Sequence, residues 1–469
     1  MTDATQTQTD AVPKRLLLRR VVVRQLFGLY DHDITLHDPV SILHGPNGVG
    51  KTTLLRMIAA VSSGALGDLE RTLFTLLELY LNDGSVVALR RAAPRKPGRA
   101  GEVTAGGAAA NGELIEFTRI EAKPDEHTEH MLRFEGYEAS SWRSGSEHGD
   151  DPGNSLAELL ELLPRGTRIT QRLVEPSWLC EVQSQLRVRF VETDRLARRT
   201  DPWAGRYATG EGAGSAVADR VEAVKQAIQS AAGAYATKSQ ELDRTFPIRV
   251  RGALADERHG RDRVNLALRL ADLERRRSRL EQLRVLVVPT DAPAAADEVT
   301  EEQDEALTRV MSLYSQDLRD KLAVLEPVAA RVELLTNQLN DKLRNKRVRC
   351  DAERGIVVTR TTDGEEIPLE GLSSGEQHQI VVLCDLLFRT EPGTLVLIDE
   401  PELSQHVSWQ RSFIRDLLDI CRVTGTVAIV ATHSPQIVGN HRDLLIGLDD
   451  DPDEAPIEED PARLASEAS

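Results

Sequence analysis

Residues 45–52 read Gly45-Pro46-Asn47-Gly48-Val49-Gly50-Lys51-Thr52 and fit the pattern G-x-x-x-x-G-K-[ST]. An apolar segment of strand length, residues 39–43, runs into the glycines, and a segment with helical apolar spacing, residues 53–58, follows them. Strand, glycine loop and helix in this order are what a phosphate-binding loop requires. The plainer alternative is a glycine turn on a surface hairpin.

Each residue type in this loop has a physical role in binding phosphate or Mg²⁺. Glycines let backbone N–H groups converge on phosphates without Cβ clashes, and the helix N-terminus adds a favourable dipole. Lys51 is expected to reach the β- and γ-phosphates of ATP, and the Thr52 hydroxyl is expected to ligate Mg²⁺. The predicted nucleotide contacts are Asn47, Gly48, Val49, Gly50, Lys51, Thr52 and Thr53.

A second segment, residues 394–400, is an apolar run of strand length that ends in Asp399 and Glu400. A buried parallel strand delivers such carboxylates to its C-terminal end, where open α/β sheets bind ligands. We expect Asp399 to serve Mg²⁺ together with Thr52, and Glu400 to polarise the attacking water. An ordinary strand followed by an acidic turn is the alternative interpretation.

Two further segments stand before and after that strand. Leu372-Ser373-Ser374-Gly375-Glu376-Gln377 precedes an apolar stretch at residues 380–388, so its small residues are expected at a helix start. Ser373 and Ser374 are good N-cap types, and Gln377 is placed as the capping-box partner, so local capping is one explanation. His433 follows the apolar strand at residues 427–430, where a single histidine is more often structural.

The order and spacing of these four segments resemble the ABC-type ATPases, in which a signature of the LSGGQ kind precedes the Walker B strand and a switch histidine ends the next strand. The resemblance implies an α/β P-loop NTPase fold of ABC-ATPase type, a mixed sheet with a parallel core plus antiparallel strands, and a helical insertion. It also implies that Ser373, Ser374 and Gly375, with Glu376 beside them, meet the γ-phosphate of ATP held by the opposite subunit. His433 would sense the same phosphate in its own subunit, with Glu400 as the other catalytic residue. ATP would then join a homodimer or a higher homo-oligomer.

Ser374 and Glu376 stand where transporter subunits usually have glycine and glutamine, so the chain looks closer to the RecF/SMC/OLD-like branch. Residues 26–28, 235–249 and 409–410 are similar to stand-alone AAA-family ATPases of Septu-like anti-phage defence systems. This resemblance implies an ATPase that regulates a protein effector partner. The alternatives are a DNA-repair ATPase that acts on nucleic acid directly and, less favoured, a transporter subunit. Relatives carry glutamine where this chain has Asp194, so whether Asp194 fills the Q-loop role stays open.

Composition favours a soluble, cytoplasmic protein. The 469 residues are 40% hydrophobic and carry a net charge of −17, which argues against a surface that generally coats nucleic acid. No apolar run approaches the ~20 residues that span a membrane, and residues 1–12 lack the apolar core of a signal peptide. The four cysteines show no metal-like spacing, so reduced thiols are expected.

The predicted organisation has four parts: a lobe with the glycine loop at 14–212, a helical insertion at 213–345, a second lobe at 346–448 and a disordered acidic tail at 449–469. In the first lobe, residues 16–18 and 21–23 are expected to form two short strands, and residues 91–112 a flexible loop. In the insertion, an apolar stripe at three- and four-residue steps runs from Leu307 to Leu343 and is interrupted at Pro327. Phe27 or Tyr30 is a candidate to stack on adenine, with simple core packing as the alternative. Basic stretches at residues 275–284 and 342–349 are either a solvated, salt-bridged helix face or a surface for a phosphate backbone.

Overall fold

A computed structural model describes residues 15–65, 69, 71–92, 114–120, 130–133, 177–191, 216–255, 263–286, 305–404 and 407–448. Asp194, the predicted tail at 449–469 and most of the loop expected between residues 91 and 112 lie outside this described part.

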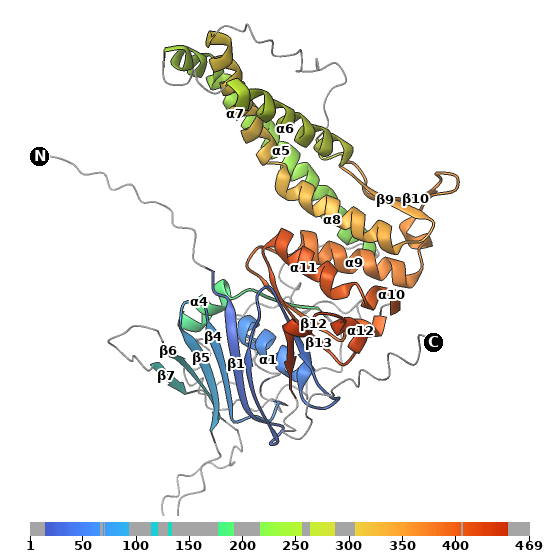
Figure 1. Cartoon of the computed structure of the whole chain (residues 1–469). Coiled ribbons are helices and arrows are strands. Elements are labelled where there is room, and N and C mark those ends of the chain that lie inside the picture. The colour runs from blue at the N-terminus through green and yellow to red at the C-terminus, as the bar shows by residue number, and fades with distance from the viewer. Residues whose placement is uncertain are drawn as a thin grey trace, which may run out of the picture.

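The centre of the molecule is a five-stranded sheet in which every adjacent pair is parallel (Figure 1). Its order is β14–β3–β13–β12–β8, with the bounds β3 Val40–His44, β8 Val188–Val191, β12 Leu395–Asp399, β13 Val427–Thr432 and β14 Leu445–Gly447. The apolar runs make it a buried sheet, because strands covered on both faces need no polar alternation. Ile42, Leu397 and Val430 are each 0% exposed.

A six-stranded antiparallel sheet is built from strands between residues 18 and 133. It has the order β2–β1–β4–β5–β6–β7, with the bounds β1 Leu18–Leu26, β2 Tyr30–Thr35, β4 Leu76–Leu81, β5 Val86–Ala92, β6 Leu114–Ile120 and β7 His130–Arg133. Sequence patterning suggested two short strands near residues 16–23, whereas the structure has the single strand β1. The turn follows at residues 27–29, where Gly28 adopts φ +75°.

Helix α1 (Lys51–Ser63) fills the space between the two sheets. Its apolar side chains share one core with β1, β4 and one face of β12 and β13, together with the short helix α4 (Ser177–Gln185). Leu55 and Ile58 are 0% exposed in this core. The glycine loop at its N-terminus is therefore held between a rigid strand and a buried helix.

The other face of the parallel sheet packs on helices α9 (Ser374–Phe388) and α11 (Phe413–Thr424). A small sheet in the order β11–β10–β9 stands beside α9, with the bounds β9 Lys346–Asp351, β10 Gly355–Arg360 and β11 Glu366–Ile367. Short helices complete this region: η4 Leu369–Gly371, η5 Pro401–Ser404, α10 Val407–Gln410, α12 Pro435–Val438 and η6 Arg442–Leu444.

In the part of the chain that the structure describes, four helices form an arm that extends from α9 and β10 (Figure 1). The helical arm comprises α5 Ala216–Ala255, α6 Arg263–Gln282, α7 Glu305–Ala323 and α8 Glu326–Lys342. The predicted interruption at Pro327 is present, because α7 ends at Ala323 and Pro327 sits in the first turn of α8, where its missing N–H costs nothing. Val332, Leu335 and Leu339 of the predicted stripe are 0% exposed.

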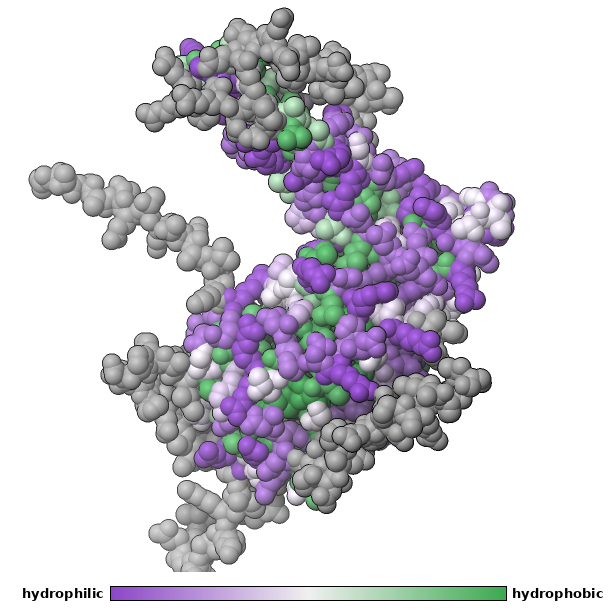
Figure 2. All heavy atoms as spheres, viewed as in Figure 1, coloured by the Kyte–Doolittle hydropathy of each residue, from purple (hydrophilic) through white to green (hydrophobic). Residues whose placement is uncertain are grey.

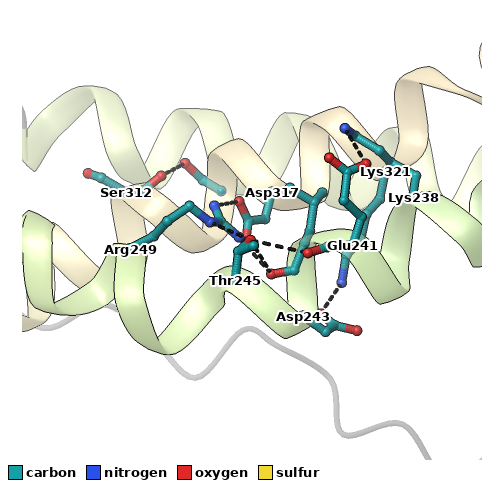
Figure 3. A network of polar contacts seen from close by, with 10 residues as sticks. Lys238, Glu241, Asp243, Thr245, Arg249, Ser312, Asp317 and Lys321 are labelled. Carbon is teal, nitrogen blue, oxygen red and sulfur yellow. Dashed lines mark hydrogen bonds and ion pairs between the residues drawn. The ribbon is translucent and has the colours of Figure 1, made fainter.

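Polar contacts as well as apolar ones join the arm helices. Figure 3 shows Arg249 of α5 and the buried Asp317 of α7 pointing toward one another, with a bond of 2.7 Å from Arg249 Nη2 to Asp317 Oδ2. Nearby, Lys321 Nζ of α7 donates to Asp243 of α5 at 2.8 Å. A buried carboxylate needs such a partner, so this pair fixes the register of α5 on α7.

The base of the arm meets α9 through charged side chains. Arg220 of α5 and Arg189 of β8 each lie 3.2 Å from Oδ1 of Asp385 on α9. Backbones also approach closely here, since a Cβ at Gly355 of β10 would lie 2.6 Å from the carbonyl oxygen of Val221 on α5. Helix α5 is thus fixed to the same helix that carries Ser374 and Gly375.

Hydrophilic side chains predominate on the arm in the view of Figure 2, and hydrophobic ones gather toward the sheets. Among the described residues, no helix is long and apolar enough to cross a membrane.

Candidate nucleotide site

The glycine loop, residues 45–52, joins β3 to α1, as the sequence pattern predicted. Gly48 and Gly50 adopt φ +94° and +98°, which side chains with a Cβ rarely adopt. At Gly50 a Cβ would also press against the buried side chain of Leu26. Both the backbone and the packing of the neighbouring strand therefore favour glycine at this position.

Lys51 lies inside the curve of this loop. Its ammonium group donates to the carbonyl oxygens of Gly45 at 2.6 Å and Pro46 at 2.9 Å, and the residue is only 5% exposed. The remaining predicted contacts follow the same backbone: Asn47 and Gly48 are exposed, Val49 is buried, and Thr53 is partly buried. The loop therefore presents exposed backbone around a buried cation, which suits a polyphosphate.

Thr52 and Asp399 meet although they are 347 positions apart in the chain. The Thr52 hydroxyl donates to Oδ1 of Asp399 at 2.9 Å. Burial raises the pKa of Asp399 above its ordinary value, and the hydrogen bond from Thr52 opposes that rise. A carboxylate whose charge is poorly solvated gains from a nearby cation.

These two oxygen donors fit Mg²⁺. The ion prefers oxygen ligands and usually binds one or two protein groups while keeping water and substrate phosphates. Within the described residues, no group of three or more His, Cys, Asp or Glu side chains is arranged to hold a metal. An open pair such as Thr52 and Asp399 suits a metal that arrives with its nucleotide.

Glu400 follows at the end of β12 in a strained conformation. Its φ is +41°, and its N–H donates to the carbonyl of Ala431 on the neighbouring strand at 2.8 Å. Strain of this kind persists only where the surrounding structure enforces it, and it clusters at functional sites. Oε1 of Glu400 lies 3.8 Å from Nδ1 of His433, so the two predicted catalytic residues are neighbours.

Glu402 completes this group, and the sequence reasoning missed it. Its Oε1 accepts from the Thr432 hydroxyl at 2.7 Å and from the His433 N–H at 3.1 Å, and it lies 3.1 Å from His433 Nδ1. The side chain is 7% exposed, and Oε2 is buried without a protein hydrogen-bond partner. The second acid in Glu400-Pro401-Glu402 was the available signal, but only the fold shows that it faces His433.

The signature segment, residues 372–377, begins α9 at an exposed helix N-terminus. Ser373 is the N-cap, as predicted, but the predicted capping-box partner was wrong: Glu376, not Gln377, bonds back to Ser373. Gln377 instead donates to the carbonyls of Leu369 at 3.0 Å and Leu372 at 3.2 Å. The capping box needs the N3 residue, and Ser373 as N-cap makes Glu376 that residue.

Ser373 and Ser374 are exposed, and Gly375 lies beside the Trp409 ring, 3.8 Å from where its Cβ would stand. The structure thus brings Thr52, Asp399, Glu400 and His433 to one end of the parallel sheet. Ser373 and Glu376, in contrast, make their described contacts with each other and with Lys346.

The two aromatic residues proposed to stack on adenine, Tyr30 and Phe27, differ in how accessible their rings are. Tyr30 is stacked on His32, with ring centroids 5.9 Å apart, and His32 in turn contacts the Val49 carbonyl at 3.0 Å. Phe27 is 40% exposed, and its ring would lie 3.4 Å from a Cβ at Gly50. Phe27 therefore has an accessible ring beside the loop, whereas Tyr30 packs within the protein.

Most of the basic residues singled out in the sequence have acidic partners. On α6, Arg275 and Arg276 pair with Asp272, and Arg277 pairs with Glu281. Further pairs join Arg279 to Glu326 and Glu333, Arg284 to Asp351, Lys342 to Asp416, Lys346 to Glu376 and Arg349 to Glu366. The salt-bridged face is the better description of these residues.

The four cysteines are thiols, and Cys350, Cys384 and Cys421 are buried. Burial raises the pKa of Cys350 to about 12 and that of Cys421 to about 11. A thiol with such a pKa stays protonated and is a poor nucleophile or metal ligand.

The fold and the glycine loop define an α/β P-loop NTPase. Residues 218–439 match the family model described as "AAA domain, putative AbiEii toxin, Type IV TA system". The matched stretch begins in α5 and ends just past His433, so it includes the signature segment, Asp399 and Glu400 but not residues 45–52. This match supports an ATPase domain of the AAA type.

A search of curated proteins found no match. Among solved structures, the chain is similar to one entitled "Crystal structure of the Smc head domain with an extended coiled coil bound to the C-terminal domain of ScpA derived from Pyrococcus furiosus". The identity is 12% and the TM-score 0.34, over 92% of this chain and 93% of that chain.

Proposed function

We propose that this protein is an ABC-type ATPase that binds and hydrolyses ATP with Mg²⁺, dimerises around the nucleotide and regulates a protein effector. Anti-phage defence is the biological setting that we favour. The proposed parts are a nucleotide-binding lobe from two chain segments, 14–212 and 346–448, and a helical insertion at 213–345 between them.

One observation carries this proposal: the hydrogen bond between Thr52 and Asp399. It joins the residue after the loop lysine to the carboxylate at the end of the neighbouring apolar strand, at 2.9 Å. The sequence patterns of the glycine loop and of the apolar strand each predicted one Mg²⁺ ligand. The structure brings these two ligands within hydrogen-bond distance of each other. Such an agreement supports a nucleotide site far better than either segment alone.

The chain's own residues divide the work of phosphoryl transfer, which is chiefly positioning and charge neutralisation. Lys51 and the loop amides bind the phosphates, and Thr52 and Asp399 would hold Mg²⁺, which supplies positive charge between the phosphates. Glu400 accepts a proton from the attacking water, and His433 contacts the γ-phosphate. The signature residues Ser373, Ser374 and Gly375 complete the site of a second subunit.

A protein partner is favoured over DNA by the charges of the arm. A surface that binds a phosphate backbone needs unneutralised Lys and Arg side chains, whose release of counterions drives binding. On α6 the four arginines at positions 275, 276, 277 and 279 pair with acids of the same helix or of α8. The arm, with its mixed charges, is better suited to a protein. Direct action on DNA, as in a repair ATPase, is the second candidate.

The test begins with Lys51→Ala, which should abolish tight ATP binding as measured by calorimetry. Glu400→Gln should keep ATP binding while lowering turnover by about 10²–10⁴-fold, the usual contribution of a general base. Ser63→Ala, at the far end of α1, is the matched control and should bind and hydrolyse ATP as the wild type does. Undiminished ATP affinity in folded Lys51→Ala protein would rule out the proposed nucleotide site.

The second candidate function, direct action on DNA, is tested by a separate measurement of DNA binding. A repair ATPase would bind DNA on its own in the presence of ATP, and its affinity would fall steeply with salt concentration. We expect the purified protein to show no such salt-dependent binding.

A further inference from the structure

The carboxylate of Glu376 stands between the signature serine and a lysine from outside the signature segment. Oε2 accepts from the Ser373 N–H and from the Ser373 hydroxyl, each at 2.9 Å. Oε1 accepts from the ammonium of Lys346 at 2.5 Å. Burial raises the pKa of Glu376, but these hydrogen bonds outweigh it and hold the pKa below its ordinary value. Glu376 is therefore a carboxylate whose charge Lys346 neutralises.

Lys346 is tied to the helical arm. It is the first residue of β9, and only residues 343–345 separate it from α8, the last arm helix. The end of α8 is itself anchored: Lys342 Nζ lies 2.8 Å from Asp416 Oδ2, and Gln338 donates to the Asp416 carbonyl at 3.1 Å. Because only three residues separate them, a shift of the end of α8 would also displace the Lys346 ammonium.

We propose that Lys346 is a positioning residue that keeps the N-terminus of α9 receptive to a phosphate and links this property to the position of the arm. The proposal rests on the proposed function and names a regulator of the same site. With Lys346 in place, the acid next to Ser373 forms a neutral pair. Without it, the carboxylate that accepts from the Ser373 hydroxyl is unneutralised and faces the incoming phosphate.

The charge of the phosphates explains why the Lys346–Glu376 ion pair matters for binding. A polyphosphate carries several negative charges, and an unpaired carboxylate beside its binding position disfavours the complex. A neutral side chain at position 376 would need no lysine. The glutamate here needs one, and Lys346 at the base of the arm provides it. A partner that moves α8 would therefore change how readily the signature engages ATP.

The experiment is a double-mutant cycle on ATP turnover with Lys346→Gln, Glu376→Gln and the double variant. Lys346→Gln in the wild-type background should lower kcat about 5- to 10-fold, a usual size for coupled neighbours, while Kd for ATP at the chain's own loop stays within about twofold. In the Glu376→Gln background, the same change should alter kcat by less than about twofold, because no charge is left to neutralise. Lys346→Arg should keep most of the turnover.

Lys342→Gln is the matched control, since it removes a buried ion pair at the other end of the same connection. Its effect on kcat should be the same in both backgrounds. An equal loss from Lys346→Gln with and without Glu376 would overturn the inference and leave the proposed function standing. A wild-type protein with no ATP turnover would instead contradict the proposed function, and this inference with it.

Discussion

Single residues carry the chemistry proposed at the end of β12, and sequence patterning selected most but not all of the residues that the structure brings together there. The loop glycines, Lys51 and Thr52 were predictable because each has a local backbone or charge reason. Glu402 was not, since its role depends on contacts with Thr432 and His433, 30 and 31 positions further on. Patterns in a sequence report local geometry, whereas contacts of this kind exist only after folding.

The position of Glu402 leads to a prediction about His433. The Glu402 carboxylate lies 3.1 Å from Nδ1 and is placed to hold the ring in position, so Glu402→Ala should lower kcat with little change in Kd for ATP. By analogy with carboxylates that orient metal-binding histidines, the loss should be about 10- to 100-fold. Steady-state ATPase kinetics and calorimetry measure the two quantities.

The necessary comparison is Glu402→Ala in a His433→Ala protein, where the substitution should change kcat only slightly. Thr432→Val is the control, because it removes another donor to the same Oε1 without touching the ring. An undiminished loss in the His433→Ala background would show that Glu402 does not act through the histidine.

Secondary-structure elements were predicted best where the period of apolar residues is long or the boundary residue is distinctive. The stripe on α7 and α8 and the break at Pro327 are examples, because helical spacing over several turns and a proline at a helix start are strong signals. The strands before the loop were split wrongly, since β1 carries three successive buried valines, Val21, Val22 and Val23, rather than a strict alternation. Burial on both faces removes the period that marks a strand.

For a single secondary-structure element, the prediction concerns the arginines of helix α6. Reversing Arg275, Arg276 and Arg277 to Glu places acids beside Asp272 and Glu281, which should destabilise the helix by about 0.2–0.5 kcal/mol for each i,i+4 pair. Basal ATP turnover should remain within about twofold. Turnover should be measured with and without duplex DNA, next to thermal unfolding.

The neutral substitution of the same three arginines by Gln separates loss of positive charge from gain of negative charge. A DNA-dependent stimulation that both variants lose would contradict the salt-bridged description and favour the repair ATPase.

At the scale of the whole molecule, the signature segment faces outward while the loop and β12 form the other part of the proposed site. Exposed Ser373 and Ser374 make no described contact with the glycine loop of their own chain, as a site shared between two subunits requires. Only the resemblance predicts a site shared between two subunits. Neither composition nor periodicity contains information about a second subunit.

ATP should therefore control assembly. Glu400→Gln protein, which keeps its nucleotide, should form dimers in ATP and Mg²⁺ and remain monomeric without nucleotide. Adding Ser373→Arg should return it to the monomer through steric and charge conflict at the shared interface, with nucleotide binding retained. Light scattering on size-exclusion fractions reports the mass in each condition.

Ser184→Arg, on the exposed surface of α4, is the control for adding a bulky cation elsewhere. Equal masses for Glu400→Gln protein with and without ATP would argue against the sandwich.

The order of strands in the parallel sheet also determines how the chain can fold during synthesis. Strand β3 pairs with β13 and β14, and Thr432 lies opposite His44, 388 positions earlier (432 minus 44). At about 5–20 residues per second, the ribosome needs roughly 20 to 80 s to deliver that partner. Throughout this interval the apolar strand that leads into the glycine loop has an open edge, which is the kind of surface that chaperones bind and that aggregates in their absence. The candidate nucleotide site is thus expected to be among the last parts of the nascent chain to fold.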